Sequence, residues 1–205
     1  SKKSTIKYGH LPPKNAEGTP WQILCVDLVG PYTVTLTKEK VVTLHAMTFI
    51  DPATGWFEIC AIPDKYSSTM SQHLNNVWFS RYPRPRKIIF DNGPEFKKDF
   101  RYIFKDYGVK TKPTTIKNPQ ANSILERVHL VLANMLRASN IANLQLSTED
   151  PWTEVLASVA YAIRSTYHTT LQATPAQLVF GRDMIYPLQY IAEWDIIRKR
   201  KQALI

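Results

Sequence analysis

The sequence predicts an α/β fold in which a mixed five-stranded sheet is flanked by helices. Three apolar runs with strand-like composition lie close together, at residues 21–29, 41–50 and 56–62. Connections this short suit an antiparallel meander. Two further strands, expected at 87–90 and from Val109, each follow a helical segment. Because a helical crossover returns a strand parallel to its neighbour, the two kinds of connection together predict a mixed sheet.

Turn-forming residues separate the first elements. Pro31 interrupts the chain between the first two strands, and Asp51-Pro-Ala-Thr-Gly55 has the composition of a tight turn before the third. Ser67 or Ser68 can then cap a helix whose apolar residues recur at helical spacing until Pro83. These signals predict three strands followed by one helix.

The second half of the chain is predicted to be mainly helical. Four helices are expected, at about 95–107, at about 119–139, from Asp150-Pro151 onward, and from Thr174-Pro175 to Gly181. Proline suits a first helical position, and glycine suits a helix end. The buried stripe of the helix at 119–139 is expected to consist of Ile124, Val128, Val131 and Met135.

The chain is basic, with 26 Lys and Arg against 17 Asp and Glu and a formal net charge of +9. Charge of this sign suggests a polyanionic partner, with nucleic acid the first candidate. Residues 97–117 alone hold seven cations against two acids. We therefore predict that Lys110, Lys112 and Lys117 contact a phosphate backbone, although a solvated basic face would have the same composition.

Cysteine usage and hydropathy exclude several protein classes. The two cysteines, Cys25 and Cys60, lie in apolar runs, so we expect buried free thiols rather than a disulfide framework or a zinc site. No apolar stretch is long enough to span a membrane, and the first residues lack the apolar core of a signal peptide. These features predict an intracellular protein that has no membrane partner.

Three carboxylates are placed as ligands of a divalent metal site. Asp27 lies inside an otherwise apolar run, where an ionisable group is costly without a partner or a metal. Asp91 follows the strand at 87–90, and Glu126 lies within the helix that begins at Pro119. Carboxylates from two strands and a helix can hold two Mg²⁺ ions about 4 Å apart, an arrangement suited to phosphodiester chemistry.

Each carboxylate also has a purely structural explanation. An Asp at a strand exit, such as Asp91, often forms a turn, and a Glu on a helix face is often a solvated charge. Asp27 is the hardest of the three to explain in this way. Other acids fit a site less well, because Asp51 belongs to a turn and Glu58 is expected to alternate outward on its strand. The following histidines show no metal-ligand spacing and are expected to be structural: His45, His73 and His168.

Amide side chains gather at the start of the helix that carries Glu126. Asn118, Gln120 and Asn122 are predicted to reach bases or phosphates near a scissile bond. Helix capping is the alternative. Capping explains Asn118 better, whereas the two explanations have equal weight for Gln120 and Asn122.

Four ordered segments resemble the integrases of retroviruses and LTR retrotransposons, most closely those of the gypsy type. The segments are Trp21…Asp27…Gly30-Pro31, Asp91-Asn-Gly-Pro-Glu-Phe96, Asn118-Pro-Gln…Glu126-Arg127, and Trp152…His168…Thr174-Pro-Ala-Gln-Leu-Val-Phe-Gly-Arg182. The resemblance implies an RNase H-like core. It also implies that Asp27, Asp91 and Glu126 are the D,D,E triad, which is catalytic and binds Mg²⁺ or Mn²⁺, two ions per site when DNA is bound.

One spacing and two positions depart from the pattern of this family. The chain has 34 residues between Asp91 and Glu126, one fewer than is usual, and a deletion in the loop before the helix would absorb the difference. Ser123 stands where glycine is common, and His129 stands where asparagine is common. Both exchanges concern DNA contacts rather than metal binding.

The resemblance implies a polynucleotidyl transferase that processes the 3′ ends of retroelement DNA and joins them to target DNA. Its implied partners are the element ends, the target DNA and further copies of itself, with a host tethering factor that the sequence does not identify. The implied location is the nucleus, after a stage inside a virus-like particle. Residues 1–20 would be a basic linker after a zinc-binding module that is not included, 21–187 the catalytic core, and 188–205 a basic extension.

Two alternative functions share the same core. A cut-and-paste DNA transposase would excise DNA through double-strand cleavage, whereas an integrase nicks near one 3′ end. A domesticated, non-catalytic DNA-binding protein would bind DNA without metal-dependent cleavage. The intact triad of Asp27, Asp91 and Glu126 favours an enzyme over the last alternative.

Overall fold

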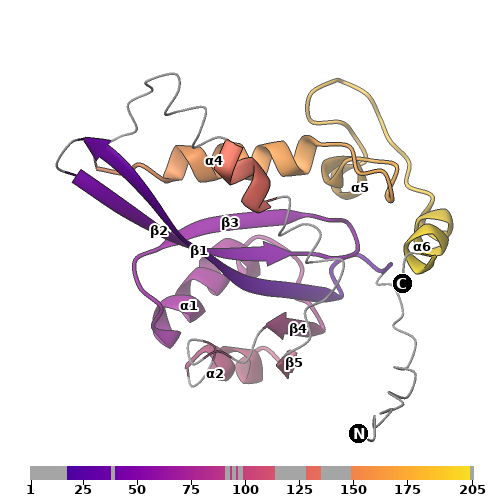
Figure 1. Cartoon of the computed structure of the whole chain (residues 1–205). Coiled ribbons are helices and arrows are strands. Elements are labelled where there is room, and N and C mark those ends of the chain that lie inside the picture. Colours follow the sequence, from indigo (N-terminus) through magenta and orange to yellow (C-terminus); the bar gives the residue numbers. More distant parts are fainter. Residues whose placement is uncertain are drawn as a thin grey trace, which may run out of the picture.

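The computed structural model describes residues 18–37, 40–90, 93, 96, 99–113, 128–134 and 149–203. Within these residues, five strands form one sheet in the order β3-β2-β1-β4-β5 (Figure 1). The strands are β1 (Ile23–Thr37), β2 (Lys40–Ile50), β3 (Phe57–Ile62), β4 (Lys87–Phe90) and β5 (Lys110–Pro113). The first three are antiparallel neighbours, while β4 runs parallel to both β1 and β5. The predicted mixed five-stranded sheet is confirmed.

Strand β1 is longer than the sequence suggests, because Pro31 does not end it. Val29 pairs with Ala46 and Tyr32 with Leu44, so Gly30 and Pro31 together face a single residue of β2. This bulge accommodates a proline that has no N–H to donate. Gly30 adopts a φ of 103°, and a Cβ there would lie 2.5 Å from the Leu44 carbonyl oxygen, so the turn of the strand requires glycine. Beyond the bulge, β1 and β2 extend past the rest of the sheet as a two-stranded ribbon (Figure 1).

Two apolar layers cover the sheet. One face carries α1 (Ser67–Leu74), the π-helical turn η1 (Asn75–Phe79) and α2 (Asp99–Asp106), and it buries Leu24 and Val26 of β1. The opposite face carries α4 (Thr153–Ser165) and the helical residues 128–134, and it buries Cys25 and Val29 (Figure 1). Alternate residues of β1 therefore face alternate layers.

Local signals account for several helix ends. Helix α5 (Pro175–Phe180) begins as expected: the Thr174 hydroxyl accepts from the Gln177 amide, and the Gln177 side chain accepts from the Thr174 amide. Gly181 ends it with a φ of 68°. The predicted serine cap of α1 is wrong, because Tyr66 occupies the cap position and its side chain makes no capping bond. Instead, the Tyr66 amide donates to the Asp64 carboxylate.

The basic C-terminal segment includes a helix that packs on the core, α6 (Trp194–Gln202). Lys201 in this helix is only 5% exposed, and its ammonium donates to the carbonyls of Pro52 and Ala53 at 2.5 and 2.6 Å. At its other side, α6 lies against Gly18, where an added Cβ would be 2.2 Å from Arg198 Cγ. None of the helices in the described ranges is long and apolar enough to cross a membrane.

Candidate active site

Asp27 lies on β1, where it pairs with Thr48 of β2. Its carbonyl oxygen accepts a hydrogen bond of 3.1 Å from the hydroxyl of Thr48 on β2, a residue that is fully buried. Its carboxylate is half-buried, and Oδ1 accepts from the Leu28 amide at 2.8 Å. The carboxylate therefore stands at a fixed place on a central strand.

The alternation of β1 sets the side of the sheet on which Asp27 lies. Cys25 and Val29, two residues to either side, are buried in one apolar cluster with Val128 and Leu132. Since residues two apart on a strand share a face, Asp27 belongs to the face that the 128–134 helix covers. The structure therefore places Asp27 on the face of the sheet against which Val128 and Leu132 pack.

Strand β4 ends next to this part of β1. Cys25 pairs with Ile89 in parallel register, and Phe90 is the last residue of β4. Phe90 is buried against Phe96, Phe100 and Phe104, with ring centroids 5.5, 5.3 and 5.8 Å away. Aromatic contacts of this kind hold the strand end firmly, so the chain leaves β4 from a defined point beside β1.

Several predicted site residues lie outside the residues that the structure describes. They are Asp91, Glu126, Lys117, Asn118, Gln120 and Asn122. Lys110 is exposed at the start of β5, and Lys112 lies within the same strand. In the described part of the chain, no group of three or more His, Cys, Asp or Glu residues could hold a metal ion.

A contact that the sequence does not suggest joins β1 to the 128–134 helix. The Tyr32 hydroxyl on β1 forms a hydrogen bond with His129 Nδ1 on the 128–134 helix. The two rings are 5.9 Å apart, with an angle of 50° between their planes. Burial raises the pKa of the Tyr32 phenol, which keeps it neutral and able to donate. The two residues are 97 positions apart, so only the unusual His129 could have hinted at this contact.

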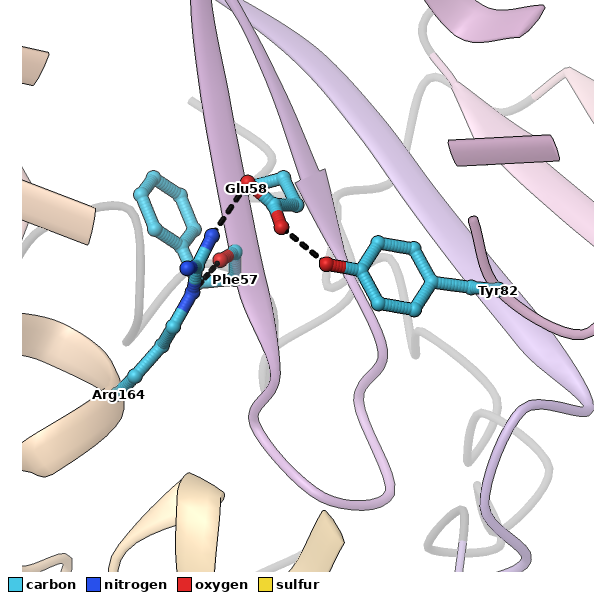
Figure 2. Close-up of polar contacts among 4 residues, drawn as sticks. All are labelled: Phe57, Glu58, Tyr82 and Arg164. Carbon is cyan, nitrogen blue, oxygen red and sulfur yellow. Dashed lines mark hydrogen bonds and ion pairs between the residues drawn. The ribbon is translucent and has the colours of Figure 1, made fainter. Parts of the chain in front are cut away.

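Glu58 does not point outward as the strand alternation suggested. It is 8% exposed, its carboxylate pairs with Arg164 of α4, and it accepts a hydrogen bond from the Tyr82 hydroxyl (Figure 2). Arg164 also donates from Nε to the Phe57 carbonyl at 2.7 Å and lies 4.6 Å above the Trp56 ring. Because β3 is the edge strand, these contacts close an otherwise open side of the sheet.

The other polar residues considered above are buried or make contacts within the fold. Asp51 is fully buried in its turn, where it accepts from the amides of Ala53 and Thr54 and from the Thr54 hydroxyl. Burial raises its pKa, while these hydrogen bonds act in the opposite direction. Neither Cys25 nor Cys60 is in a disulfide; Cys25 is buried and Cys60 half-buried, with Cys60 Sγ 3.5 Å from His73 Nδ1. Burial raises the pKa of the Cys60 thiol to about 12.

Comparisons with a protein family, with individual proteins and with solved structures all find integrases, integrase-like proteins or retroviral polyproteins. Residues 18–119 match the integrase core domain. The gypsy retrotransposon integrase-like protein 1 of Pongo abelii is 23% identical over 169 residues, which are 82% of this chain and 30% of that protein. Its Rattus norvegicus counterpart is 32% identical over 109 residues, or 53% of this chain and 20% of that protein. The Pro-Pol polyprotein of simian foamy virus type 3 is 24% identical over 91% of this chain and 15% of its own length. The chain thus spans less than a third of each of these relatives.

Solved structures share the fold. The integrase catalytic core domain of HTLV-2, in complex with magnesium in a trimeric form, aligns with a TM-score of 0.55 at 19% identity, over 77% of this chain and 95% of that one. The simian T-cell lymphotropic virus intasome, in complex with PP2A regulatory subunit B56 gamma, aligns at 0.65 and 18%, over 94% of this chain and 64% of that one. The sheet and its helices are therefore RNase H-like. Together with the match over residues 18–119, this fold establishes that the chain carries an integrase core domain, related to those of gypsy-type retrotransposons and retroviruses.

Proposed function

We propose that this chain is the catalytic core of an LTR-retroelement integrase. It would process the 3′ ends of the element's DNA and then join them to target DNA, using one active site for both steps. One observation carries the proposal: Asp27 is half-buried on the face of β1 that the 128–134 helix covers, beside the end of β4, within an integrase core fold.

The proposed active site consists of Asp27, Asp91 and Glu126. In the parallel register of β1 and β4, Cys25 pairs with Ile89. Asp27 follows Cys25 by two residues in the sequence, and Asp91 follows Ile89 by two, directly after the end of β4. Glu126 precedes the buried Val128 by two residues, and consecutive Cα atoms are ~3.8 Å apart, so it lies within about 8 Å of a residue packed on β1. Both relationships support convergence of the three carboxylates.

These side chains fit a hard divalent cation, because all three offer oxygen donors. Asp27 is also held in place, since its carboxylate accepts from the Leu28 amide and its carbonyl accepts from the Thr48 hydroxyl. Asp27, Asp91 and Glu126 would hold Mg²⁺ or Mn²⁺, two ions when DNA is bound. When bound, the ions would activate an attacking oxygen and stabilise the leaving oxygen at phosphorus. The chain's own part is to hold three carboxylates in one orientation, and the Thr48 hydroxyl supports this at Asp27.

DNA binding is proposed for the basic segment beside this site. Lys110 and Lys112 lie on β5, next to β4, and Lys110 is exposed. Together with Lys117 they would contact phosphates, while Asn118, Gln120 and Asn122 would reach nucleotides near the scissile bond. The net charge of +9 supports binding to double-stranded DNA at both the element end and the target. Bridging two DNA ends requires more than one copy, so we propose a homo-oligomer that acts in the nucleus.

A non-catalytic role is the second candidate. It is favoured by relatives named integrase-like proteins, such as that of Pongo abelii, of which this chain spans only 30%. Such a protein would bind DNA through the same basic surface without cutting it. A cut-and-paste transposase is the remaining alternative, and it would produce double-strand excision.

A strand-transfer assay on short duplexes with Mg²⁺ or Mn²⁺ separates the three functions. We expect metal-dependent joining by the unaltered chain and none by Asp91→Asn, which keeps the shape of the side chain and removes its charge. DNA binding without metal-dependent joining would support the non-catalytic role. Excision of a fragment flanked by two ends would support the transposase.

A further inference from the structure

Two lysines face each other at the start of β4 and β5. Lys87 and Lys110 are directly opposite in the parallel register of these strands, and neighbouring strands lie about 4.8 Å apart. Like charges placed directly opposite each other destabilise a sheet. Lys110 is exposed and Lys87 half-buried, and neither forms an ion pair with any residue that the structure describes. A bound anion would offset this repulsion.

Two arginines extend the positive charge around the lysine pair. Arg86 directly precedes Lys87, and its carbonyl accepts from the Lys110 amide at 3.0 Å, so it adjoins both lysines. The Arg84 guanidinium lies 4.2 Å from the centroid of the Tyr107 ring. Both arginines are exposed, and within the described ranges neither has a carboxylate partner. Together, the four residues form a basic corner of the sheet: Arg84, Arg86, Lys87 and Lys110.

The basic corner is held in place by the fold. The amides of Arg86 and Lys87 both donate to the Gln22 carbonyl, at 3.0 and 3.2 Å, so the backbone that carries these cations is fixed. The Tyr107 ring is fixed as well, because its hydroxyl donates to Asn75 Oδ1 at 3.3 Å. Cations that are already positioned lose less conformational entropy when they bind a ligand. A merely solvated basic loop would need no such support.

The lysine pair lies on the same face of the sheet as Asp27. Lys87 is in register with Ile23 of β1, and residues in register on neighbouring strands share a face. Ile23 packs against the same apolar cluster as Cys25, and Asp27 follows Cys25 by two residues. Four residues of β1 separate Ile23 from Asp27, a rise of about 13 Å. This distance corresponds to about four base pairs of duplex DNA, which rises about 3.4 Å per pair.

We propose that the basic corner binds the phosphate backbone of the DNA duplex whose end reacts beside Asp27, about four base pairs from that end. Lys87 and Lys110 hold one phosphate between them, and Arg84 and Arg86 each contact a further phosphate. The contact reads no base and is therefore independent of sequence. Its position along the duplex rests on the proposed function, whereas the binding itself does not.

The first test measures binding by the full chain to a labelled duplex of about 20 base pairs, over a range of salt concentrations and without divalent metal. Lys87→Gln, Lys110→Gln and their combination remove the lysine pair, and Arg84→Gln with Arg86→Gln removes the arginines. Lys105→Gln is the matched control. Lys105 is an exposed lysine on α2, which packs on the opposite face of the sheet from Asp27.

The log–log salt slope should become less steep by about 0.9 in the double lysine variant, which loses one phosphate contact. It should become less steep by about 1.8 in the double arginine variant, which loses two. Lys105→Gln should keep the slope of the unaltered chain. Without DNA, Lys87→Gln and Lys110→Gln should each raise the melting temperature by about 1–2 °C at low salt, because each relieves the repulsion across the strands. High salt should remove this gain.

The second test locates the contact along the duplex. Neutral methylphosphonate linkages replace the phosphates three to five base pairs from the joined 3′ end, and strand transfer is measured at limiting DNA. The unaltered chain should join this DNA several-fold more slowly than unmodified DNA. The double lysine variant should join both at the same rate, because it lacks the cations that these phosphates contact. An equal slowing of both proteins would overturn the proposed position.

Unchanged salt slopes in both double variants would overturn the inference. The same change of slope in Lys105→Gln would also overturn it, because net charge alone would then explain the effect. Tighter binding of a single strand than of a duplex would exclude duplex DNA as the partner. A lower melting temperature of the lysine variants at an unchanged slope would make Lys87 and Lys110 structural residues. A chain with the expected slopes that joins no DNA would support this surface and overturn the proposed function instead.

Discussion

Arg164 of α4 and Glu58 of the edge strand β3 form an ion pair in which both side chains are largely buried. Glu58 also accepts from Tyr82, so a single carboxylate joins a helix, an edge strand and the loop after η1 (Figure 2). Removing one partner leaves the other charge buried without compensation, which is more costly than removing both.

Glu58→Gln and Arg164→Met should therefore each lower the free energy of unfolding by about 3 kcal/mol. The double variant should lose clearly less than the sum of the two. Urea unfolding followed by tryptophan fluorescence measures all three values. Tyr82→Phe is a useful comparison, since it removes one hydrogen bond and should cost only about 1 kcal/mol. Strict additivity would show that the two charges do not interact.

The three proposed metal ligands should be individually essential. Asp27→Asn, Asp91→Asn and Glu126→Gln each remove a charged ligand and keep the shape of the side chain, so each should abolish both end processing and strand transfer. Duplex binding should survive, because it depends on the basic surface. Near-normal turnover by Glu126→Gln would show that this residue has been assigned wrongly.

Salt dependence tests the DNA contacts. The affinity for duplex DNA should fall steeply with salt, with a log–log slope of about −0.9 per phosphate contacted. Replacing Lys110, Lys112 and Lys117 with Gln should flatten the slope while changing sequence preference little. Lys65→Gln, at an exposed position before α1, is the control for loss of a charge away from β5. An unchanged slope in the triple variant would assign these lysines to a solvated face.

The Cys60 thiol should lower stability at alkaline pH. Its pKa is raised from the ordinary value of 9.0 to about 12 by burial, so the folded state favours the protonated thiol. Below pH 9 this has no effect; from pH 9 towards 12 the unfolded chain loses the proton first, and stability falls as the pH rises. By pH 10 the loss amounts to about 1.4 kcal/mol relative to a chain without the thiol. Urea unfolding of the unaltered chain and of Cys60→Ala between pH 8 and 10.5 would show it as a difference in slope, and parallel pH profiles would contradict it.

Lys201 should fix α6 to the core. Lys201→Met keeps most of the volume and removes the donor to the Pro52 and Ala53 carbonyls, at an expected cost of about 2 kcal/mol. Lys199→Met is the matched control, because Lys199 is exposed on the same helix. Limited proteolysis should cut the Lys201→Met variant within or before α6 faster than the control. Equal rates would mean that Ile197, which is buried, holds the helix alone.

Elements defined by local signals were predictable from the sequence. The cap at Thr174, the end at Gly181 and the strand Lys87–Phe90 each depend on residues within a few positions. Features that depend on distant partners were not predictable. For example, β1 continues past Pro31 only because β2 pairs with it across a bulge. Glu58 points inward because Arg164, more than a hundred residues later, offers it a charge.

The candidate site shows the same division. Asp27 was identifiable because a charge in an apolar run is costly, and its position on a central strand follows from that run. Its contact with Thr48 and the pairing of Tyr32 with His129 were not identifiable, because each joins segments that only the fold brings together. A charge in an apolar run is visible in a local pattern, whereas the groups that contact it come from distant parts of the chain.

The contact between Gly18 and Arg198 has a consequence for the neighbouring segments of the chain. Residue 18 precedes the first strand of the sheet, and Arg198 lies within α6 near the other end of the described chain, so the two ends of the core touch directly at this point. A methyl group at position 18 would collide with the Arg198 side chain, which would have to adopt another rotamer to make room for it. The glycine therefore matters here for the space it leaves, because it lets an arginine from a segment 180 residues away lie against the backbone.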